Sequence, residues 1–413
     1  MKLKKLSLCF FLGHFILFSL LAAQEKGEET LRLKIGDEKL KDKVMEIFPG
    51  KIYSAQLGKP VEFSRMISEM EKARIVYVGE SHNSLPMHEI QLRILEALFF
   101  RHRNTALGLE MFPVTLQEVL NKWSLGILTT KEFIEEAEWY LTWNFNFSYY
   151  EEIFDFAKEN SIPVYGLNVP RKIIRKIRMQ GWRALSEEEK KLVPEPDVTN
   201  KEHRVLIRTI FESAEIPHQM KGRGMDRMFE GLYRAQSAWD EVMAHNVLKV
   251  AKREGRRVVV LAGSGHLIYN LGINRRAYEK SGLPFKTVII VPVPEGKEGV
   301  LVARSLADYV FGIEEEERPV YPSIGLSLKK IDGLENIVID SDPISGVAKG
   351  QDFRKGDVIL SVDKRAFSSI NNLRIYLSRF TWGDEVTFRL LRQAEEKEVV
   401  LKFELVEESK DKN

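Results

Sequence analysis

A short apolar segment that runs into Gly-x-x-His occurs twice in this 413-residue chain. Residues 74–79 lead into Gly79-Glu80-Ser81-His82, and residues 257–263 lead into Gly263-Ser264-Gly265-His266. Both segments are of strand length, rich in β-branched residues and without helical periodicity, which predicts fully buried strands. Because glycine lets the backbone turn as each strand ends, each histidine is expected just past the carboxyl end of a core strand. Open α/β sheets bind their ligands at that edge.

Strand-like runs alternate with segments of helical spacing through most of the chain. The strand-like runs cover residues 74–79, 105–110, 162–168, 257–263 and 285–293, and the helical segments cover 86–100, 149–160 and 236–254. This alternation predicts an α/β fold with a mostly parallel sheet flanked by helices. Two insertions, an aromatic one at 114–147 and a charged one at 170–234, are expected to form a lid or a helical subdomain.

The pattern of apolar and polar residues changes after a charged linker at 312–320 that ends in proline and valine. Short alternating strands are predicted at 337–339, 357–361 and 385–391, with one helix at 370–379. A stretch of this size can fold independently. We therefore expect an α/β domain with helical insertions over 24–311 and a small β-rich domain over 321–408.

The first 23 residues have the features of a secretory signal. Three lysines near the start are followed by an apolar run without acidic residues, and small residues at Ala22 and Ala23 suit cleavage. An uncleaved membrane anchor is the alternative, although Gly13 and His14 interrupt the short apolar run. The sequence predicts a signal peptide at 1–23 and a secreted or periplasmic protein, with association to the envelope left open.

Removal of residues 1–23 changes both the charge and the thiol content. The formal charge falls from +2 to −1 because three lysines leave, so no global basic balance favours nucleic acid. The single cysteine, Cys9, leaves as well, which excludes a thiol nucleophile, a cysteine zinc site and a disulfide in the mature chain. Nothing resembling a lipoprotein cleavage site precedes Cys9.

Side chains capable of chemistry gather at the predicted strand ends, namely Glu80, His82, Glu110, Asn168 and His266. Parallel strands would bring them to one edge of the sheet. His82, His266 and Glu110 could then hold a divalent metal, which would lower the pKa of a bound water. Without a metal, Glu80, His82, Glu110 and His266 could provide general acid–base catalysis towards an ester or amide. The alternative is structural, with carboxylates that accept backbone N–H groups and histidines that cap turns.

His88 is a further candidate. It falls in the first turn of the helix that Pro86 suits as a start, and Gln91 lies on the same helical face. His88 should therefore lie near the crevice of His82, as a ligand-binding group or as an exposed polar residue.

Arg171 and Tyr269 follow two of the other strand ends. Arg171 comes shortly after Asn168 and could pair bidentately with a ligand carboxylate or phosphate, or hold Glu110 in place. Tyr269 comes three residues after His266, and haem iron accepts axial His, Tyr or Met. No spacing in the chain specifies haem.

Six motifs in order resemble the ChaN-like haem-binding family, within the superfamily that includes Tiki and TraB proteins and erythromycin esterases. They are Gly79-Glu80-Ser81-His82, Pro86…His88…Gln91, Gly108-Leu109-Glu110-Met111-Phe112, Gly166-Leu167-Asn168, Gln236…Asp240…Met243-Ala244 and Gly263-Ser264-Gly265-His266. The resemblance covers roughly residues 50–300. It implies binding of haem or an iron ligand, a part in iron uptake, and cofactor contacts from His88, Asn168, Arg171 and Tyr269. More distant relatives include metal-dependent proteases and hydrolases.

Residues 321–408 resemble a PDZ domain of the kind attached to bacterial envelope proteases. The resemblance rests on Ile324-Gly325-Leu326-Ser327, Asp342-Pro343, Gly346-Val347-Ala348, Phe353…Gly356-Asp357-Val358-Ile359 and Trp382-Gly383-Asp384. It implies that Ile324, Gly325, Leu326 and Ser327 receive the carboxylate of a protein C-terminus, with the peptide added as a strand. The alternative is a small β-domain that only helps assembly.

The leading hypothesis is a ChaN-like envelope protein that binds haem or an iron ligand and carries a PDZ peptide-binding module. One rival is a metal-dependent protease or esterase that uses the paired Gly-x-x-His motifs, and another is a non-catalytic PDZ scaffold. The sequence does not decide whether the protein is an enzyme. The expected partners are haem or another small molecule and protein C-termini, not nucleic acid, and a homodimer is left open.

Overall fold

The computed structural model describes residues 25–213, 223–253 and 255–404, so the expected signal peptide at 1–23 lies outside the described residues. Contacts divide the described chain into two compact units. The N-terminal unit contains residues up to 127 together with 150–317, and the C-terminal unit contains 128–149 together with residues from 318 onwards.

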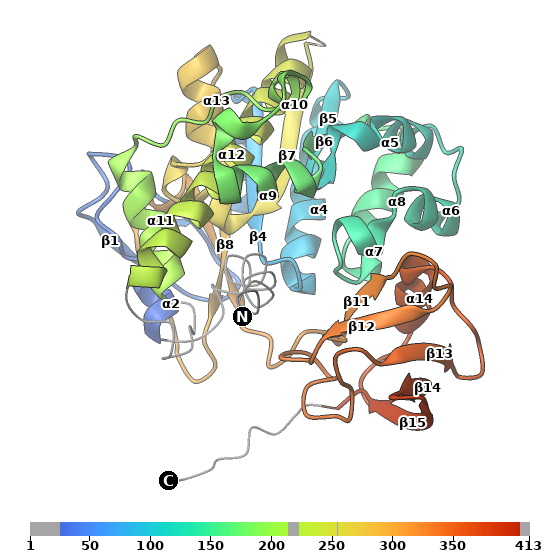
Figure 1. Cartoon of the computed structure of the whole chain (residues 1–413). Helices are drawn as coiled ribbons and strands as arrows, with labels where there is room; N and C mark the ends of the chain where they lie inside the picture. Colours follow the sequence, from blue (N-terminus) through green and yellow to red (C-terminus); the bar gives the residue numbers. More distant parts are fainter. Residues whose placement is uncertain (1–24, 214–222, 254, 405–413) are drawn as a thin grey trace. The chain divides into compact units, whose positions relative to one another are not determined.

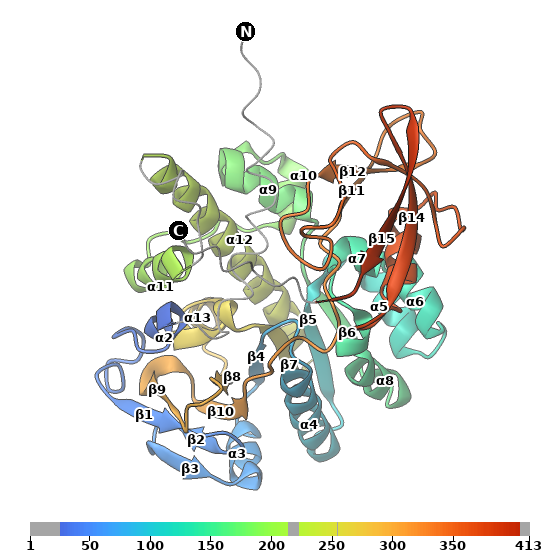
Figure 2. The same cartoon turned by 90° about the horizontal axis from the view of Figure 1, so that it is seen from below.

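The N-terminal unit is built on a sheet whose described strands follow the order β3-β2-β10-β8-β4-β7-β5-β6 (Figures 1 and 2). Neighbours from β10 to β6 are parallel, whereas β2 and β3 are antiparallel at one edge. The expected α/β fold with a mostly parallel sheet is confirmed. The strands are β2 (Ile52–Ser54), β3 (Lys59–Val61), β4 (Ile75–Glu80), β5 (Thr105–Pro113), β6 (Val164–Asn168), β7 (Arg257–Gly263), β8 (Phe285–Val293) and β10 (Tyr309–Glu314).

The central strands are buried because both faces of the sheet carry helices. Every residue of β4 is buried, and all of β7 after its first residue is buried, as their continuous apolar runs predict. Figure 2 shows α12 (Arg223–Arg253) and α13 (Ile273–Ser281) on one side of the sheet, and α4 (Leu85–Arg101) and α8 (Glu151–Glu159) on the other. The parallel register places Glu80 opposite Gly263, so β4 and β7 end at the same level.

The remaining elements of the N-terminal unit are peripheral to this core. Strands β1 (Val44–Ile47) and β9 (Val300–Ala303) form a separate antiparallel pair. The other α-helices described in this unit are α2 (Glu25–Thr30), α3 (Phe63–Met70), α5 (Gln117–Ser124), α9 (Arg171–Gln180), α10 (Glu187–Leu192) and α11 (Lys201–Ser213). Short 3₁₀ turns occur at η2 (Val114–Leu116), η4 (Trp182–Ala184), η6 (Ser264–His266), η7 (Ile268–Asn270) and η8 (Arg304–Leu306).

The C-terminal unit contains an antiparallel sheet, with described strands in the order β11-β12-β13-β14-β15. The strands are β11 (Ser327–Lys330), β12 (Ile337–Ser341), β13 (Val358–Val362), β14 (Glu385–Arg392) and β15 (Glu395–Lys402), and the helix is α14 (Ile370–Leu377). Alternating burial along β14 packs one face of the sheet onto a core that includes Phe388 and Leu373. The expected small β-rich domain is therefore present.

Two boundaries differ from the sequence-based expectation. Residues 312–314, expected in the linker, continue β10 and pair with β8 as far as Glu314. Residues 128–149, expected in the α/β domain, belong to the C-terminal unit by their contacts. They form α6 (Thr130–Glu136), α7 (Trp139–Thr142) and η3 (Phe147–Tyr149). Local helical spacing cannot show which unit a short helix will pack against, because that depends on distant partners.

Candidate functional site

The carboxyl ends of β4, β5 and β7 meet at one edge of the sheet, since these strands are parallel neighbours. Glu80 is the last residue of β4, Glu110 lies near the end of β5, and His266 ends the 3₁₀ turn that follows β7. All three are buried. The structure thus brings Glu80 of the first Gly-x-x-His motif and His266 of the second to the same edge of the sheet as Glu110.

Close packing between the two motifs depends on glycine. A Cβ atom on Gly79 would lie 2.6 Å from Ile289 Cδ1 and 2.9 Å from Ser264 Oγ. Since Ser264 belongs to the second motif, the missing side chain of Gly79 lets the second turn approach β4. Gly272 supports the same turn, because a Cβ there would lie 2.0 Å from the backbone oxygen of His266.

The first cluster centres on Glu80. Its Oε1 lies 2.7 Å from His82 Nδ1 and accepts a hydrogen bond from the Tyr150 hydroxyl at 3.0 Å. Its Oε2 lies 2.8 Å from His88 Nδ1, which is also 3.0 Å from Gln91 Oε1. The predicted proximity of His88 to His82 and Gln91 is present, and His88 is buried rather than an exposed polar residue. One carboxylate therefore orients two imidazoles and a phenol.

The ionisation of this cluster follows from its mutual contacts. Burial by itself would raise the pKa of Glu80, but the nearby charges and hydrogen bonds of His88 and His82 outweigh it and lower that pKa. Burial would lower the pKa of His88, but the Glu80 carboxylate raises it above the ordinary histidine value. Glu80 is therefore an anion that stabilises the protonated form of His88.

The second cluster centres on His266. Its Nδ1 lies 2.5 Å from Asp240 Oδ1, and its Nε2 lies 3.3 Å from Glu110 Oε1. The other oxygen of Glu110 accepts a hydrogen bond from the backbone N–H of Gly263 at 2.7 Å, and Asp240 Oδ2 lies 3.1 Å from His203 Nε2. Both ring nitrogens of His266 therefore face carboxylates.

These contacts give His266 and His203 opposite protonation states. Burial opposes the charged form of His266, but Glu110 and Asp240 overcome it and raise the pKa of His266 to about 10. The pKa values of Asp240 and Glu110 are lowered, because the charge of His266 outweighs the effect of burial on each. Burial lowers the pKa of His203 in spite of its bond to Asp240. At neutral pH, His266 is thus charged and His203 is neutral.

The two clusters are electrostatically linked. After the contributions of burial and His266, the charge of His82 is among the influences that lower the pKa of Glu110. Since screening by water is weak among buried groups, charge added to one cluster changes protonation in the other. The edge behaves as one acid–histidine network.

Asn168 and Tyr269 donate side-chain hydrogen bonds to backbone oxygens and not to the acid or histidine side chains of this network. The amide of Asn168 donates to the backbone oxygen of Glu110 at 3.3 Å, not to its carboxylate. Arg171 is exposed at the first residue of α9, which follows β6. The Tyr269 hydroxyl donates to the backbone oxygen of Thr30 at 2.7 Å.

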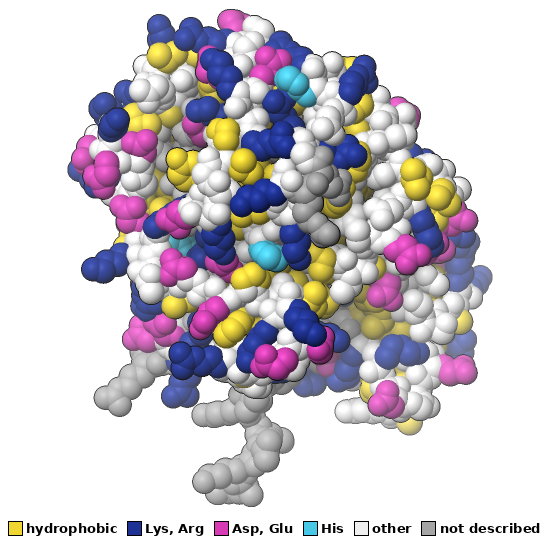
Figure 3. Space-filling model, turned by 90° about the horizontal axis from the view of Figure 1, so that it is seen from above, with side chains coloured by type: hydrophobic (Ala, Val, Ile, Leu, Met, Phe, Trp, Pro, Cys, Tyr) yellow, Lys and Arg dark blue, Asp and Glu magenta, His cyan; other side chains and the backbone are white. Residues whose placement is uncertain are grey.

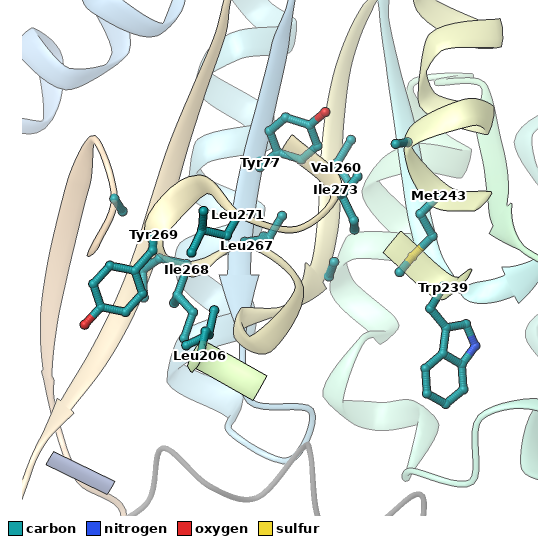
Figure 4. Close-up of a cluster of buried hydrophobic side chains, with 14 of the residues drawn as sticks. Tyr77, Leu206, Trp239, Met243, Val260, Leu267, Ile268, Tyr269, Leu271 and Ile273 are labelled. Atoms are coloured by element: carbon teal, nitrogen blue, oxygen red, sulfur yellow. The ribbon is translucent and has the colours of Figure 1, made fainter. Parts of the chain in front are cut away.

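Tyr269 lies away from the network. Figure 4 shows Tyr269 and Trp239 at opposite sides of a group of apolar side chains that includes Leu267 and Leu271. The Trp239 ring packs edge-on at 6.3 Å from the ring of His266. Tyr269 accordingly joins the segment at Thr30 to the core and does not point towards His266.

No group of three or more His, Cys, Asp or Glu side chains among the described residues has an arrangement suited to a metal ion. A shallow depression lies at the opposite edge of the sheet, at the amino ends of β4 and β7, and its basic lining residues are Lys72, Arg74, Lys252 and Arg257. Lys and Arg side chains also lie among apolar ones over the face drawn in Figure 3. In the described part of the chain, no helix has the length and apolarity needed to cross a membrane.

Sequence reasoning did not select Asp240, His203 or Tyr150 as site residues. Asp240 and Gln236 are polar residues four positions apart on the buried side of α12. Because buried polar groups need partners, polar residues on an otherwise apolar helix face could have indicated a functional site. His203 lies on the apolar face of α11 with Leu206 and is similarly visible. Tyr150 follows an aromatic-rich stretch, and nothing local distinguishes it from a core residue.

The predicted peptide-binding loop lies before and at the start of β11. Gly325 has a φ of +78°, and a Cβ there would lie 1.8 Å from the backbone oxygen of Ser345, so glycine is required. The backbone oxygen of Ile324 accepts from Ala348 N at 3.0 Å. Leu326 and Ser327 are buried, and Leu326 joins the core of the unit. The loop is therefore held in one conformation beside an edge strand.

Comparison with known families identifies both parts of the chain. The model described as "Haem-binding uptake, Tiki superfamily, ChaN" matches residues 66–277, which is about half of the chain. The chain belongs to the ChaN family. A PDZ domain model matches residues 322–403, so this ChaN-family member also carries a PDZ domain. Both resemblances seen in the sequence are confirmed.

One solved structure agrees with this ChaN fold, and one further protein is similar in sequence over part of the chain. A solved structure entitled "Cofacial heme binding to ChaN of Campylobacter jejuni" is 22% identical, with a TM-score of 0.51, and the match covers 64% of this chain and 96% of that one. At this identity the likeness shows the fold alone. Protein RETICULATA-RELATED 5, chloroplastic, of Arabidopsis thaliana is 30% identical over 166 residues, which are 37% of this chain. The match spans only 22% of that relative's length.

Proposed function

We propose that the N-terminal unit binds haem or an iron ligand at the carboxyl edge of the sheet, with His82 as the iron-binding residue. The observation that carries the proposal is the Glu80–His82 pair. Glu80 Oε1 lies 2.7 Å from His82 Nδ1, so Nε2 is the ring nitrogen that would bind the iron. Metal-binding histidines characteristically donate their other ring N–H to a carboxylate in this way.

The types of side chain at this edge fit haem. Imidazole and phenol groups, of the kinds that bind haem iron, are present in His82 and Tyr150, and Arg171 is an exposed guanidinium suited to a propionate. Bound haem would supply an iron centre whose properties the axial residue sets. Glu80 would fix the ring of His82 and increase its basicity, and His88 would balance the charge of Glu80.

His266 fits this role less well than the sequence suggested. Its two nitrogens face Asp240 and Glu110, and its pKa is raised to about 10, so it is protonated at neutral pH. A protonated imidazole has no lone pair for a metal, and it cannot act as a general base. The geometry therefore supports ligand binding through His82 more than a metal-dependent hydrolase built on both Gly-x-x-His motifs.

Access to the site has a kinetic consequence. The side chains of Glu80 and His82 are each 1% exposed, so the edge must open before a ligand as wide as haem can reach them. Binding that requires such a change is slower than ordinary association. We expect haemin to bind this protein slowly and with saturation, at a rate that levels off as haemin concentration rises.

Titration of the full chain with haemin tests the proposal. A saturable, shifted Soret band is expected for the wild type, and it should be lost in His82→Ala. Glu80→Gln should weaken binding by about tenfold, because it removes the carboxylate that orients the ring. His102→Ala is the matched control, since His102 is half-exposed at the end of α4, at the opposite edge of the sheet. Equal haemin binding by His82→Ala and the wild type would rule out the assignment.

We also propose that the C-terminal unit binds protein C-termini through residues 324–327. Strand β11 stands at the edge of its sheet, where an added strand can pair, and the rigid loop at Gly325 precedes it. A peptide with a free C-terminal carboxylate should bind, whereas the same peptide with an amidated end should not. Equal binding of both peptides would exclude recognition of the terminal carboxylate.

The compartment is part of the same proposal. Residues 1–23 have the features of a secretory signal, and a cell-envelope location would suit a protein that takes part in iron or haem uptake. Fractionation of the native host with an antibody to the protein tests this. Recovery of the full-length chain in the cytoplasm would contradict it.

A further inference from the structure

Two consecutive tyrosines belong to different units and make different contacts. Tyr149 ends the part of the chain that belongs to the C-terminal unit, and Tyr150 begins the return of the chain to the N-terminal unit. Tyr149 contacts Tyr321 of the C-terminal unit, and Tyr150 contacts Glu80 and His88 of the N-terminal unit. The link between them is one peptide bond.

Within the C-terminal unit, Tyr149 is fixed to the segment that leads into the peptide-binding loop. Its hydroxyl accepts from Tyr321 N at 3.1 Å and lies 3.4 Å from Tyr321 O, to which it donates. The two rings pack edge-to-face with centroids 4.9 Å apart. Tyr321 is three residues before Ile324, so displacement of the loop acts directly on Tyr149.

The same 128–149 segment also contacts the helix of the PDZ domain. Arg374 on α14 donates to the backbone oxygen of Tyr140, and Asn146 donates to the backbone oxygen of Ser378 at 3.0 Å. Burial lowers the pKa of Arg374 to about 10. A peptide added beside β11 would pack between this strand and α14, so segment 128–149 is attached to one wall of the proposed groove, α14, and to Tyr321, which leads into the peptide-binding loop.

Within the N-terminal unit, Tyr150 is part of the acid–histidine network. Its hydroxyl donates to Glu80 Oε1 at 3.0 Å, and its ring lies 4.1 Å from that of His88. Tyr150 is also buried, which limits its freedom to rotate independently of the backbone at Tyr149.

We propose that occupation of the PDZ groove by a peptide C-terminus is transmitted through the Tyr149–Tyr150 pair to the Glu80–His82–His88 cluster, so that peptide and site ligand regulate each other's binding. The proposal rests in part on the peptide-binding function proposed above. Its physical basis is that α14 and Tyr321 hold segment 128–149, whose last residue, Tyr149, is joined by a peptide bond to Tyr150, which donates to Glu80. Linkage requires the effect to be reciprocal, since a peptide that alters the site must itself bind differently when the site is altered.

Nuclear magnetic resonance of the full chain with ¹³C-labelled histidine rings provides the first test. The probe is a decapeptide that ends in two valines with a free carboxylate, and the amidated peptide serves as control. The free-carboxylate peptide should shift the ring signals of His82 and His88. Tyr149→Phe should still bind the peptide but should lose most of this response, because its hydroxyl no longer connects to Tyr321.

The reciprocal test measures peptide affinity by fluorescence anisotropy. Tyr150→Phe keeps the ring but removes the hydroxyl that donates to Glu80, and it should change peptide affinity by about fivefold, within the usual range for coupled sites. Tyr278→Phe is the control, because Tyr278 is an exposed residue of α13, and it should leave the affinity unchanged.

The outcomes separate this inference from the function on which it partly rests. Peptide binding that leaves both histidines unchanged, or an equal response in Tyr149→Phe, would overturn the coupling while leaving peptide recognition intact. If the peptide does not bind, the proposed peptide recognition is wrong. The link between the units is then tested by comparing the histidine ring signals of Tyr149→Phe with those of the wild type, both without peptide. A shift of the His88 signals in that variant supports the link between the units, and unchanged signals overturn it.

Discussion

Replacement of Asp240 by asparagine should convert His266 from a residue that is fully charged at neutral pH into one that titrates near neutral pH. Asp240 Oδ1 lies 2.5 Å from His266 Nδ1, and both side chains are almost completely buried. The pKa of His266, raised to about 10, depends on this carboxylate together with Glu110. Asparagine keeps the shape of the side chain and removes the charge.

The expected size follows from the electrostatics of the pair. Two unit charges about 4 Å apart attract each other by about 4 kcal/mol at an effective dielectric constant of about 20. Since about 1.4 kcal/mol corresponds to one pH unit, the pKa of His266 should fall by about three, to about 7. Loss of the partner from a buried ion pair should also reduce the free energy of unfolding by about 3 kcal/mol.

Ring signals of ¹⁵N-labelled histidine distinguish charged from neutral imidazole and give the pKa directly. Glu241→Gln is the matched control, because Glu241 is the next residue on α12, is equally buried and pairs instead with Arg276 at 3.2 Å. This control should lose comparable stability and leave the pKa of His266 near 10. If His266 were still charged at pH 9 in Asp240→Asn, the electrostatic account of the second cluster would be wrong.

Three further changes test other parts of the structure. The pKa of His266 is raised, so its contribution to stability is complete below about pH 6.5 and is lost as pH rises towards 10. The pKa of Asp240 is lowered, so its contribution to stability is present above about pH 4 and is lost on acidification. Urea unfolding across this range should therefore show greatest stability between about pH 5 and 6.5, and a flat profile would contradict these shifts. Gly272→Ala should lower the free energy of unfolding by about 2 kcal/mol in the same assay, because its Cβ would collide with a backbone oxygen. Gly282→Ala is the control, because Gly282 has open space around it despite a φ of +65°, and an equal loss of stability in this control would exclude the collision as the cause. Arg392→Met should destabilise the C-terminal unit by about 3 kcal/mol, because it leaves a buried aspartate uncompensated, and an unchanged melting temperature for that unit would refute this.

The sequence identified the central strands well because burial on both faces leaves a strong local pattern. Continuous runs of β-branched residues predicted β7 and β8 with the bounds that the structure shows, and the glycines at the ends of the runs 74–79 and 257–263 predicted the turns that follow β4 and β7. Parallel pairing then required Glu80 and His266 to reach the same edge. This part of the candidate site follows from local signals together with one rule of topology.

The parts that were not predicted depend on partners far away in the chain. The antiparallel edge strands β2 and β3 are short and carry Pro60, so they lack a clear strand pattern. Segment 128–149 looks like any aromatic helical insertion until its contacts with α14 are known. Asp240 contacts His266 only because α12 packs near the end of β7. The helical pattern of the sequence predicts that Asp240 is buried, but it does not predict that His266 is its partner.

The proposed function depends on a carboxylate-oriented His82 that binds the iron of haem. The most direct measurement is electron paramagnetic resonance of the haemin-loaded full chain, with histidine labelled by ¹⁵N, to detect the nitrogen bound to iron. We expect a histidine nitrogen coupling in the wild type and in His102→Ala, and its disappearance in His82→Ala. The same coupling in His82→Ala, or no histidine nitrogen in the wild type, would contradict the claim.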